Sequence, residues 1–223
     1  MSRSFISRTA AAVSTGLFML ASMPASATIV GGNVTGGSAF TAGGTFINLT
    51  VPFAQSNPDN TVGNDNFNTP NLYGFNESQN ILLANNLQMN VGAGNVLTVL
   101  AGVTVASHYI FFDPLTSMNI DGTVNFDSDV LGIITETGLL NASDPLANTG
   151  VTYLNPGLRG LEPGDSVTIS GARQIRFNTS AASPGDYVRV ITAFSPSAVP
   201  EPGSLALVGL ALAGMGLLSR RKV

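Results

Sequence analysis

The sequence contains no cysteine and no tryptophan among its 223 residues, and it has a single histidine. The lack of cysteine excludes disulfide bonds and thiol chemistry, although exported proteins need neither. The lack of tryptophan weakens the case for the stacking platform that many carbohydrate-binding modules use. Charged residues form only 10% of the chain, against about a quarter in typical proteins. The apolar fraction of 44% is ample for a core.

Positive charge is concentrated at the two ends of the chain. Arg3 and Arg8 lie in the first ten residues, and three of the last four residues are basic. The region from residue 28 to 198 contains four Arg, no Lys and twelve Asp or Glu, which gives a net charge of −8. A region of this sign lacks the basic footprint that nucleic acid requires. We therefore predict no nucleic-acid partner.

The first 27 residues show the three parts of a secretory signal peptide. These parts are a positive region with Arg3 and Arg8, a mostly apolar region over residues 9–21, and the small-x-small cleavage pattern Ala25, Ser26 and Ala27. The two Arg are not adjacent, as a twin-arginine signal would require. We therefore expect an N-terminal signal-peptide helix that directs export by the Sec machinery, and a mature chain that begins near Thr28. An amphipathic or buried helix is the alternative, but Pro24 and the Ala-Ser-Ala triplet favour cleavage.

Residues 28–198 show repeated period-two alternation of apolar side chains, which is typical of strands. The segments are residues 45–53, 87–91, 95–106 (one bent strand or two around Gly102), 108–112, 118–126, 165–170, 173–177 and 186–194. Clusters of Gly, Pro, Asn and Asp separate them. The pattern predicts an all-β extracytoplasmic domain, built as an antiparallel β-sandwich or jelly-roll-like fold. We expect residues 28–44 to form a loose first segment with one short strand, and residues 131–140 to hold one helical turn.

The single histidine is the first catalytic candidate. His108 follows Ser107 and precedes Asp113, so the residue types of a Ser-His-Asp site lie close in sequence. Adjacent strand residues point to opposite faces, so Ser107 cannot serve His108 on a regular strand. No G-x-S-x-G pattern marks another serine. We therefore expect a structural or half-buried His108.

Two acidic features suggest other chemistry. Asp127 and Asp129 would face the same way on a strand, as a glycosidase pair or a hard-cation site requires, but the stretch also resembles a strand-ending turn. Residues 57–68 supply the oxygen ligands that Ca²⁺ prefers, without matching the EF-hand pattern. Such loops are also ordinary between strands. We predict no cofactor, with bound Ca²⁺ as the open alternative.

The central region has four cations, Arg159, Arg173, Arg176 and Arg189. We expect them to form salt bridges with Asp165 or Asp186, and a sugar or anion contact is the alternative. The sequence has no Walker loop, Rossmann fingerprint, zinc pattern or H-E-x-x-H. We therefore predict a protein that is not an enzyme.

The last 25 residues, 199–223, carry the strongest signal. Their parts are Val199, Pro200, Glu201 and Pro202, then sixteen uncharged residues (203–218), then the basic residues Arg220, Arg221 and Lys222. Sixteen residues span about 24 Å as a helix, whereas a bilayer core of about 30 Å usually needs about 20. We expect a short transmembrane helix whose basic tail stays cytoplasmic. The signal peptide then places the central domain on the other side of the membrane, away from the cytoplasm.

This order of parts resembles the PEP-CTERM sorting signal of Gram-negative bacteria. The resemblance implies that an exosortase, a membrane-embedded transpeptidase-like enzyme, recognises the Pro-Glu-Pro motif. It also implies that the helix is a temporary membrane anchor and that the chain is processed near the motif and sent to the cell surface. The alternative is a plain C-terminal anchor, which needs no Pro-Glu-Pro and would favour a longer span.

Parts of the central region also resemble an uncharacterised family of secreted bacterial proteins with the same tail. The matching stretches are residues 75–80, 107–114, 122–134, 151–169 and 183–192. The resemblance implies a shared fold and location and assigns no activity. Such tails commonly accompany exopolysaccharide genes. We predict a non-enzymatic cell-surface or biofilm-matrix protein with exopolysaccharide as a partner; the alternatives are a secreted polysaccharide hydrolase and a Ca²⁺- or glycan-binding adhesion module.

Overall fold

The computed structural model describes residues 27–194. The predicted signal-peptide helix with Ala25, the predicted transmembrane helix, the Pro-Glu-Pro motif and the basic tail all lie outside the described residues. Within residues 27–194, the helices are too short to cross a membrane.

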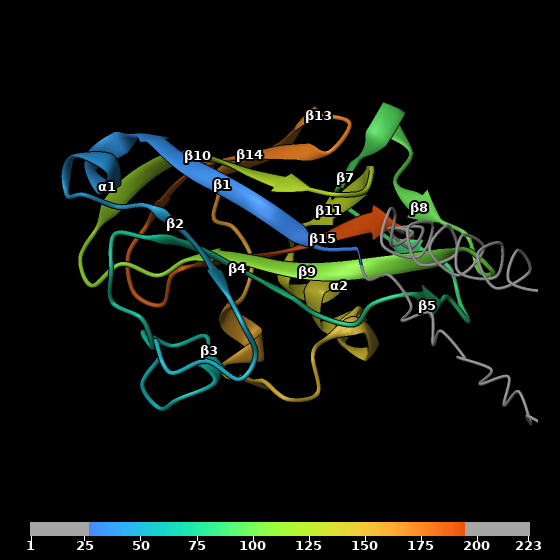
Figure 1. Cartoon of the computed structure of the whole chain (residues 1–223), viewed down its shortest axis with the longest axis horizontal. Helices are drawn as coiled ribbons and strands as arrows, with labels where there is room; N and C mark the ends of the chain where they lie inside the picture. Colours follow the sequence, from blue (N-terminus) through green and yellow to red (C-terminus); the bar gives the residue numbers. More distant parts are fainter. Residues whose placement is uncertain (1–26, 195–223) are drawn as a thin grey trace, which may run out of the picture.

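Most strands belong to two sheets (Figure 1). The four-stranded sheet has the order β1 (Ile29–Gly36), β10 (Met118–Phe126), β14 (Gln174–Ala181) and β13 (Ser166–Gly171). The seven-stranded sheet has the order β2 (Phe46–Leu49), β4 (Leu72–Asn76), β9 (Thr104–Phe112), β15 (Asp186–Ala193), β11 (Val130–Ile134) and β7 (Val91–Gly92), with β5 (Ile81–Leu82) also paired to β9.

The remaining elements are short. Two small sheets pair β12 (Thr152–Tyr153) with β3 (Thr61–Val62) and β6 (Leu87–Gln88) with β8 (Thr98–Val99). The helices are α1 (Gly37–Thr41) and α2 (Thr137–Ala142), with 3-10 turns η1 (Ala93–Asn95), η2 (Asp144–Leu146) and η3 (Pro156–Leu158). The all-β prediction is therefore confirmed for the described residues, and α2 is the helical turn expected within residues 131–140.

The first core lies between the two sheets. β14 alternates buried and exposed residues, so Ile175 and Phe177 point inward while their neighbours face solvent. They share one apolar cluster with Ile110 of β9 and Val188 and Val190 of β15. Each sheet thus contributes one face to a common core, as in stacked sheets.

A second core covers the other face of the large sheet. Aromatic side chains of β4, β9 and β15 pack there, with Tyr73 stacked on Phe111 at 5.3 Å and Phe111 stacked on Tyr187 at 5.6 Å between ring centroids. Residues of the 50–70 segment and of α2 close this layer, including Phe53 and Leu140. Figure 1 shows β3 and α2 below the large sheet and the four-stranded sheet above it. β9 is therefore buried on both faces, as its nearly continuous burial shows.

Several details differ from the sequence predictions. Residues 28–44 are not a loose segment, because β1 pairs with β10 over its length and α1 follows directly. The strand predicted over residues 45–53 ends at Leu49, and residues 87–91 divide between β6 and β7. Two pairings, β2 with β4 and β3 with β12, are parallel. Residues 95–106 form two strands with a turn at Gly102, where φ is +85°; the jelly-roll description stays a prediction.

Candidate functional site

His108 is enclosed in the first core. Its Nδ1 is 2.9 Å from the Asn76 Oδ1, its Nε2 is 3.0 Å from the Thr192 Oγ1, and its ring lies 4.9 Å from that of Phe126. Burial lowers the pKa of His108 to about 3, so the ring is neutral at physiological pH. Both ring nitrogens are therefore engaged in holding β9 to its neighbours.

The neighbouring catalytic candidates do not join His108. Ser107 lies on the opposite face of β9, where its hydroxyl donates to the Glu77 Oε2 at 2.6 Å. Asp113 follows β9, and its Oδ2 accepts a hydrogen bond from the Phe67 N–H at 3.0 Å. Burial raises the pKa of Asp113 to about 6. The structure therefore contains the residue types of a Ser-His-Asp site without its geometry.

Asp127 and Asp129 lie in the bend between β10 and β11 and contact different segments. The Asp127 Oδ1 accepts a hydrogen bond from the backbone N–H of Thr28 at 2.8 Å, and the Thr28 hydroxyl lies 3.2 Å from its Oδ2. The Asp129 Oδ1 lies 3.0 Å from the Arg173 Nε, with both side chains 62% exposed. Each of the two carboxylates therefore has a structural contact of its own.

The loop over residues 57–68 uses its polar side chains mainly on nearby backbone. The Asn66 Nδ2 donates to the Asn57 carbonyl at 2.8 Å, and the Asn68 Nδ2 donates to the Asp65 carbonyl at 2.7 Å. The Asn60 amide donates to the carbonyl of Gly150. These contacts match the turn-forming alternative for this loop, and its Ca²⁺ alternative stays a prediction.

The predicted arginine partners were wrong. The observed ion pairs are Arg159–Asp144, Arg173–Asp129, Arg176–Asp121, Arg189–Glu77 and Arg189–Asp144. Arg176 shows the reason. It sits opposite Thr123 in the β10–β14 register, so its side chain lies on the same face as Asp121, two residues away. Cross-strand register, which the sequence does not display, decides the pairing.

A buried ionic network centres on Glu77, which follows β4. The Arg189 Nε lies 2.6 Å from the Glu77 Oε2, and the Arg189 Nη2 lies 2.8 Å from its Oε1. Both side chains are fully buried. The hydroxyls of Ser107 and Tyr153 donate to the same carboxylate at 2.6 and 2.7 Å. Burial alone would lower the pKa of Arg189. The Glu77 carboxylate outweighs this effect and holds that pKa above its usual value.

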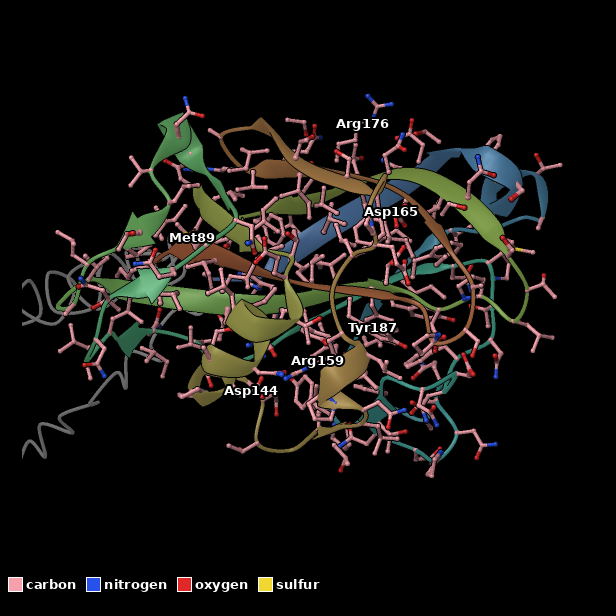
Figure 2. The ribbon with its side chains drawn as sticks, turned by 180° about the vertical axis from the view of Figure 1, so that it is seen from behind. Met89, Asp144, Arg159, Asp165, Arg176 and Tyr187 are labelled. Carbon is pink, nitrogen blue, oxygen red and sulfur yellow. The ribbon has the colours of Figure 1, made fainter. Side chains whose placement is uncertain are left out.

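The network continues to the loop beyond α2. The Arg189 Nη1 donates to the Leu140 carbonyl at 3.0 Å, and the Asp144 Oδ1 lies 3.4 Å from the Arg189 Nη2. The Arg159 Nη1 donates to the same Asp144 oxygen at 2.9 Å, and Figure 2 shows these two side chains beside each other. The network therefore ties residues 137–159 to the large sheet.

A group of three carboxylates forms a different kind of site. One oxygen from each of Glu162, Asp165 and Asp186 lies within 4.8 Å of the others. Glu162 and Asp165 precede β13, and Asp186 begins β15. Figure 2 labels Asp165, and it labels Tyr187, which follows Asp186 at the start of β15. Two members of the group, Glu162 and Asp165, line a surface hollow of about 450 Å³; its other lining residues are Ser117, Pro163, Gly164, Ser180, Ala182 and Ser183.

Asp186 is the unusual member of this group. It is fully buried, and neither of its carboxylate oxygens accepts a hydrogen bond. Burial is the main cause that raises its pKa, and the negative charges of Asp165 and Glu162 add to it, giving a value of about 8. The nearby Thr179 hydroxyl opposes the rise of this pKa. Asp186 therefore holds a proton at neutral pH.

From the sequence, Asp165 and Asp186 were expected only as arginine partners, and Glu162 was not a candidate. The available signal was a repeated Pro-Gly-Asp triplet, at residues 163–165 and 184–186, directly before two strands. Both glycines have positive φ, +111° at Gly164 and +91° at Gly185. The same turn chemistry thus delivers an aspartate to the start of each strand.

Comparison with known families matched the C-terminal part of the chain. The PEP-CTERM protein-sorting motif matches residues 198–222, which lie outside the described residues. The motif confirms the predicted sorting signal and implies an exported protein, with a transient membrane-anchored precursor, that an exosortase-type enzyme recognises in Gram-negative bacteria. No curated protein and no solved structure matched the chain. The resemblance of the central region to a secreted family stays a prediction.

Proposed function

We propose that this protein is a non-enzymatic component of the cell surface or of the exopolysaccharide matrix, released there from a temporary membrane anchor. The observation that carries the proposal is the sorting motif at residues 198–222. The predicted order of signal peptide, acidic domain, short apolar span and basic tail supports it. A span of sixteen uncharged residues is poorly suited to permanent anchoring, whereas an anchor that is later removed needs no greater length.

The contacts of the catalytic candidates support a non-enzymatic role. His108 is buried and neutral, with both ring nitrogens engaged. Asp127 and Asp129 are directed to Thr28 and Arg173. A glycosidase places two carboxylates on either side of a substrate cleft, about 5 to 9.5 Å apart. The observed arrangement therefore favours a surface module over a secreted polysaccharide hydrolase.

The fold supports a surface role through its stability. The large sheet is covered on both faces, by the four-stranded sheet on one side and by residues 50–70 and α2 on the other. The Glu77–Arg189 network joins the loop layer to this sheet. We propose that this β-sandwich-like body persists outside the cell without disulfides.

The sorting proposal is tested by intact mass of the surface form from strains with and without the exosortase. We expect the strain with the exosortase to yield a chain that lacks residues 203–223, and the strain without it to retain them. The variant Glu201→Ala should behave as the exosortase deletion does, and Ser197→Ala, just outside the motif, should be processed normally. Identical masses that include residues 203–223 in both strains would contradict the proposal.

The non-enzymatic part has its own test. Purified surface protein is incubated with the exopolysaccharide of the producing strain, and new reducing ends are measured. We expect no release above a heat-denatured control, together with sedimentation of the protein with the polysaccharide. Release of reducing ends would establish the hydrolase alternative.

A further inference from the structure

The spacing of the three-carboxylate group suits a hard cation. One oxygen from each of Glu162, Asp165 and Asp186 lies within 4.8 Å of the others. Calcium binds oxygens at 2.3–2.6 Å, so two ligands of one ion lie at most about 5 Å apart. A single ion placed among these three oxygens can therefore contact all of them. The group contains no His or Cys, which excludes the ligand sets typical of zinc.

The second observation is the state of Asp186, which differs from that of the buried Glu77 carboxylate. Glu77 is also buried, but it receives hydrogen bonds from Arg189, Ser107 and Tyr153. Neither oxygen of Asp186 receives any, although the residue is fully buried. A buried polar group without a partner is costly. A cation among the carboxylates would supply the missing partner.

The surrounding backbone orients the ligands toward one point. The Ser180 N–H donates to the Asp165 Oδ1 at 2.7 Å, which fixes that side chain and leaves its other oxygen available. Gly185, with φ of +91°, sets the position of the next residue, Asp186. A Cβ on Gly185 would lie only 2.8 Å from the Phe112 carbonyl oxygen. The adjoining hollow of about 450 Å³ gives water access. Water can thus complete the six to eight ligands that calcium takes.

From these observations we propose that Glu162, Asp165 and Asp186 form a calcium site on the exported domain. Two carboxylates on turns and one buried carboxylate, completed by water, correspond to the weak sites of extracellular modules, with Kd of about 10⁻⁴ to 10⁻³ M. Such a site fills outside the cell. It links the β13 turn to the first residue of β15, which is a central strand of the large sheet.

The test uses the full chain purified in a mild detergent, titrated with CaCl₂ by calorimetry and by thermal unfolding. We expect a Kd of about 0.1–1 mM and a rise in Tm with calcium. Asp186→Asn and Asp165→Asn should each weaken binding at least tenfold. The matched control is Asp129→Asn, a change at an exposed ion pair remote from the group in the fold, which should bind as wild type.

Several outcomes would overturn the assignment. They are the absence of a calcium response in the wild-type chain at 5 mM, an equal response to MgCl₂, and wild-type affinity in Asp165→Asn. The Asp165 variant keeps the test valid if Asp186→Asn does not fold. The measurement requires no exosortase, so its failure is distinct from failure of the sorting proposal.

Discussion

Removal of the Glu77 carboxylate tests the energetic role of the buried network most directly. Glu77→Ala deletes both ion-pair contacts to Arg189, at 2.6 and 2.8 Å, and removes the acceptor of the Ser107 and Tyr153 hydroxyls. Arg189 stays fully buried, with the half-exposed Asp144 at 3.4 Å as its remaining acid. Breaking one partner of a buried pair costs about 3–5 kcal/mol, because a charge is left uncompensated. We expect a loss of that size in the free energy of unfolding.

The assay is urea unfolding of the full chain in mild detergent, followed by tyrosine fluorescence and circular dichroism. With an m-value of about 2–3 kcal/mol/M, the midpoint should fall by about 1–2 M. Asp129→Ala is the matched control, since its pair with Arg173 is 62% exposed on both sides and should change stability by less than about 1 kcal/mol.

A double variant separates the pair from its surroundings. Glu77→Leu combined with Arg189→Met replaces both charges by apolar groups, which is often neutral for buried pairs. We expect the double variant to recover at least half of the loss seen in Glu77→Ala. A loss in Glu77→Ala no larger than in Asp129→Ala, or no recovery in the double variant, would refute the reasoning.

Three further predictions follow from single contacts. In EDTA, stability should fall as pH rises from 7 to 9, because folded Asp186 holds its proton to a pKa of about 8 whereas an unfolded Asp loses it near 4; Asp186→Asn should remove about 1.4 kcal/mol of that fall in Tm-derived stability. If cleavage makes Thr28 the first residue, its ammonium meets Asp127 where an amide now lies at 2.8 Å, so Asp127→Asn should destabilise the cleaved chain by about 1 kcal/mol more than the precursor in urea unfolding. Gly185→Ala should cost about 3 kcal/mol, because a Cβ there meets a backbone carbonyl at 2.8 Å, whereas Gly43→Ala, also at positive φ but in open space, should cost about 1 kcal/mol.

Each of these has a clear contrary result. Equal pH slopes for wild type and Asp186→Asn would remove Asp186 as the titrating group. Equal effects of Asp127→Asn on precursor and cleaved chain would show that the new terminus does not pair with it. Equal losses in the two glycine variants would attribute the cost to backbone conformation alone.

The strands that the sequence predicted well are bounded by turn residues. β10, β13 and β15 lie within about two residues of the predicted bounds, whereas β14 continues four residues beyond the predicted end at Phe177. β1 was expected only as one short strand in a loose segment, because its sequence, IVGGNVTG, contains three glycines and little alternation. Its position depends on a contact with a distant residue, since a Cβ at Gly32 would lie 2.6 Å from the Phe46 ring.

The candidate site was accessible from the sequence only in part. The two Pro-Gly-Asp turns were visible, but Asp165 and Asp186 are separated by the whole β13–β14 hairpin. Their approach requires both sheets to be assembled. The ion pairs of the arginines also depend on the assembled fold. Strand register pairs Arg176 with Asp121, and burial pairs Arg189 with Glu77.

Local features of the sequence were enough to indicate export and a strand-rich domain. These features are the sorting motif at residues 198–222, the basic ends around an acidic centre, and the period-two patterns of a chain without cysteine. These are local features, because a motif, a charge pattern and a period of two are each contained in one stretch of chain. Only the tertiary structure decided which charges meet. It enclosed His108, compensated Glu77 with Arg189, and left Asp186 buried beside two other carboxylates without a hydrogen-bond donor. Burial and long-range pairing set these environments, and both arise only when strands distant in sequence are packed together.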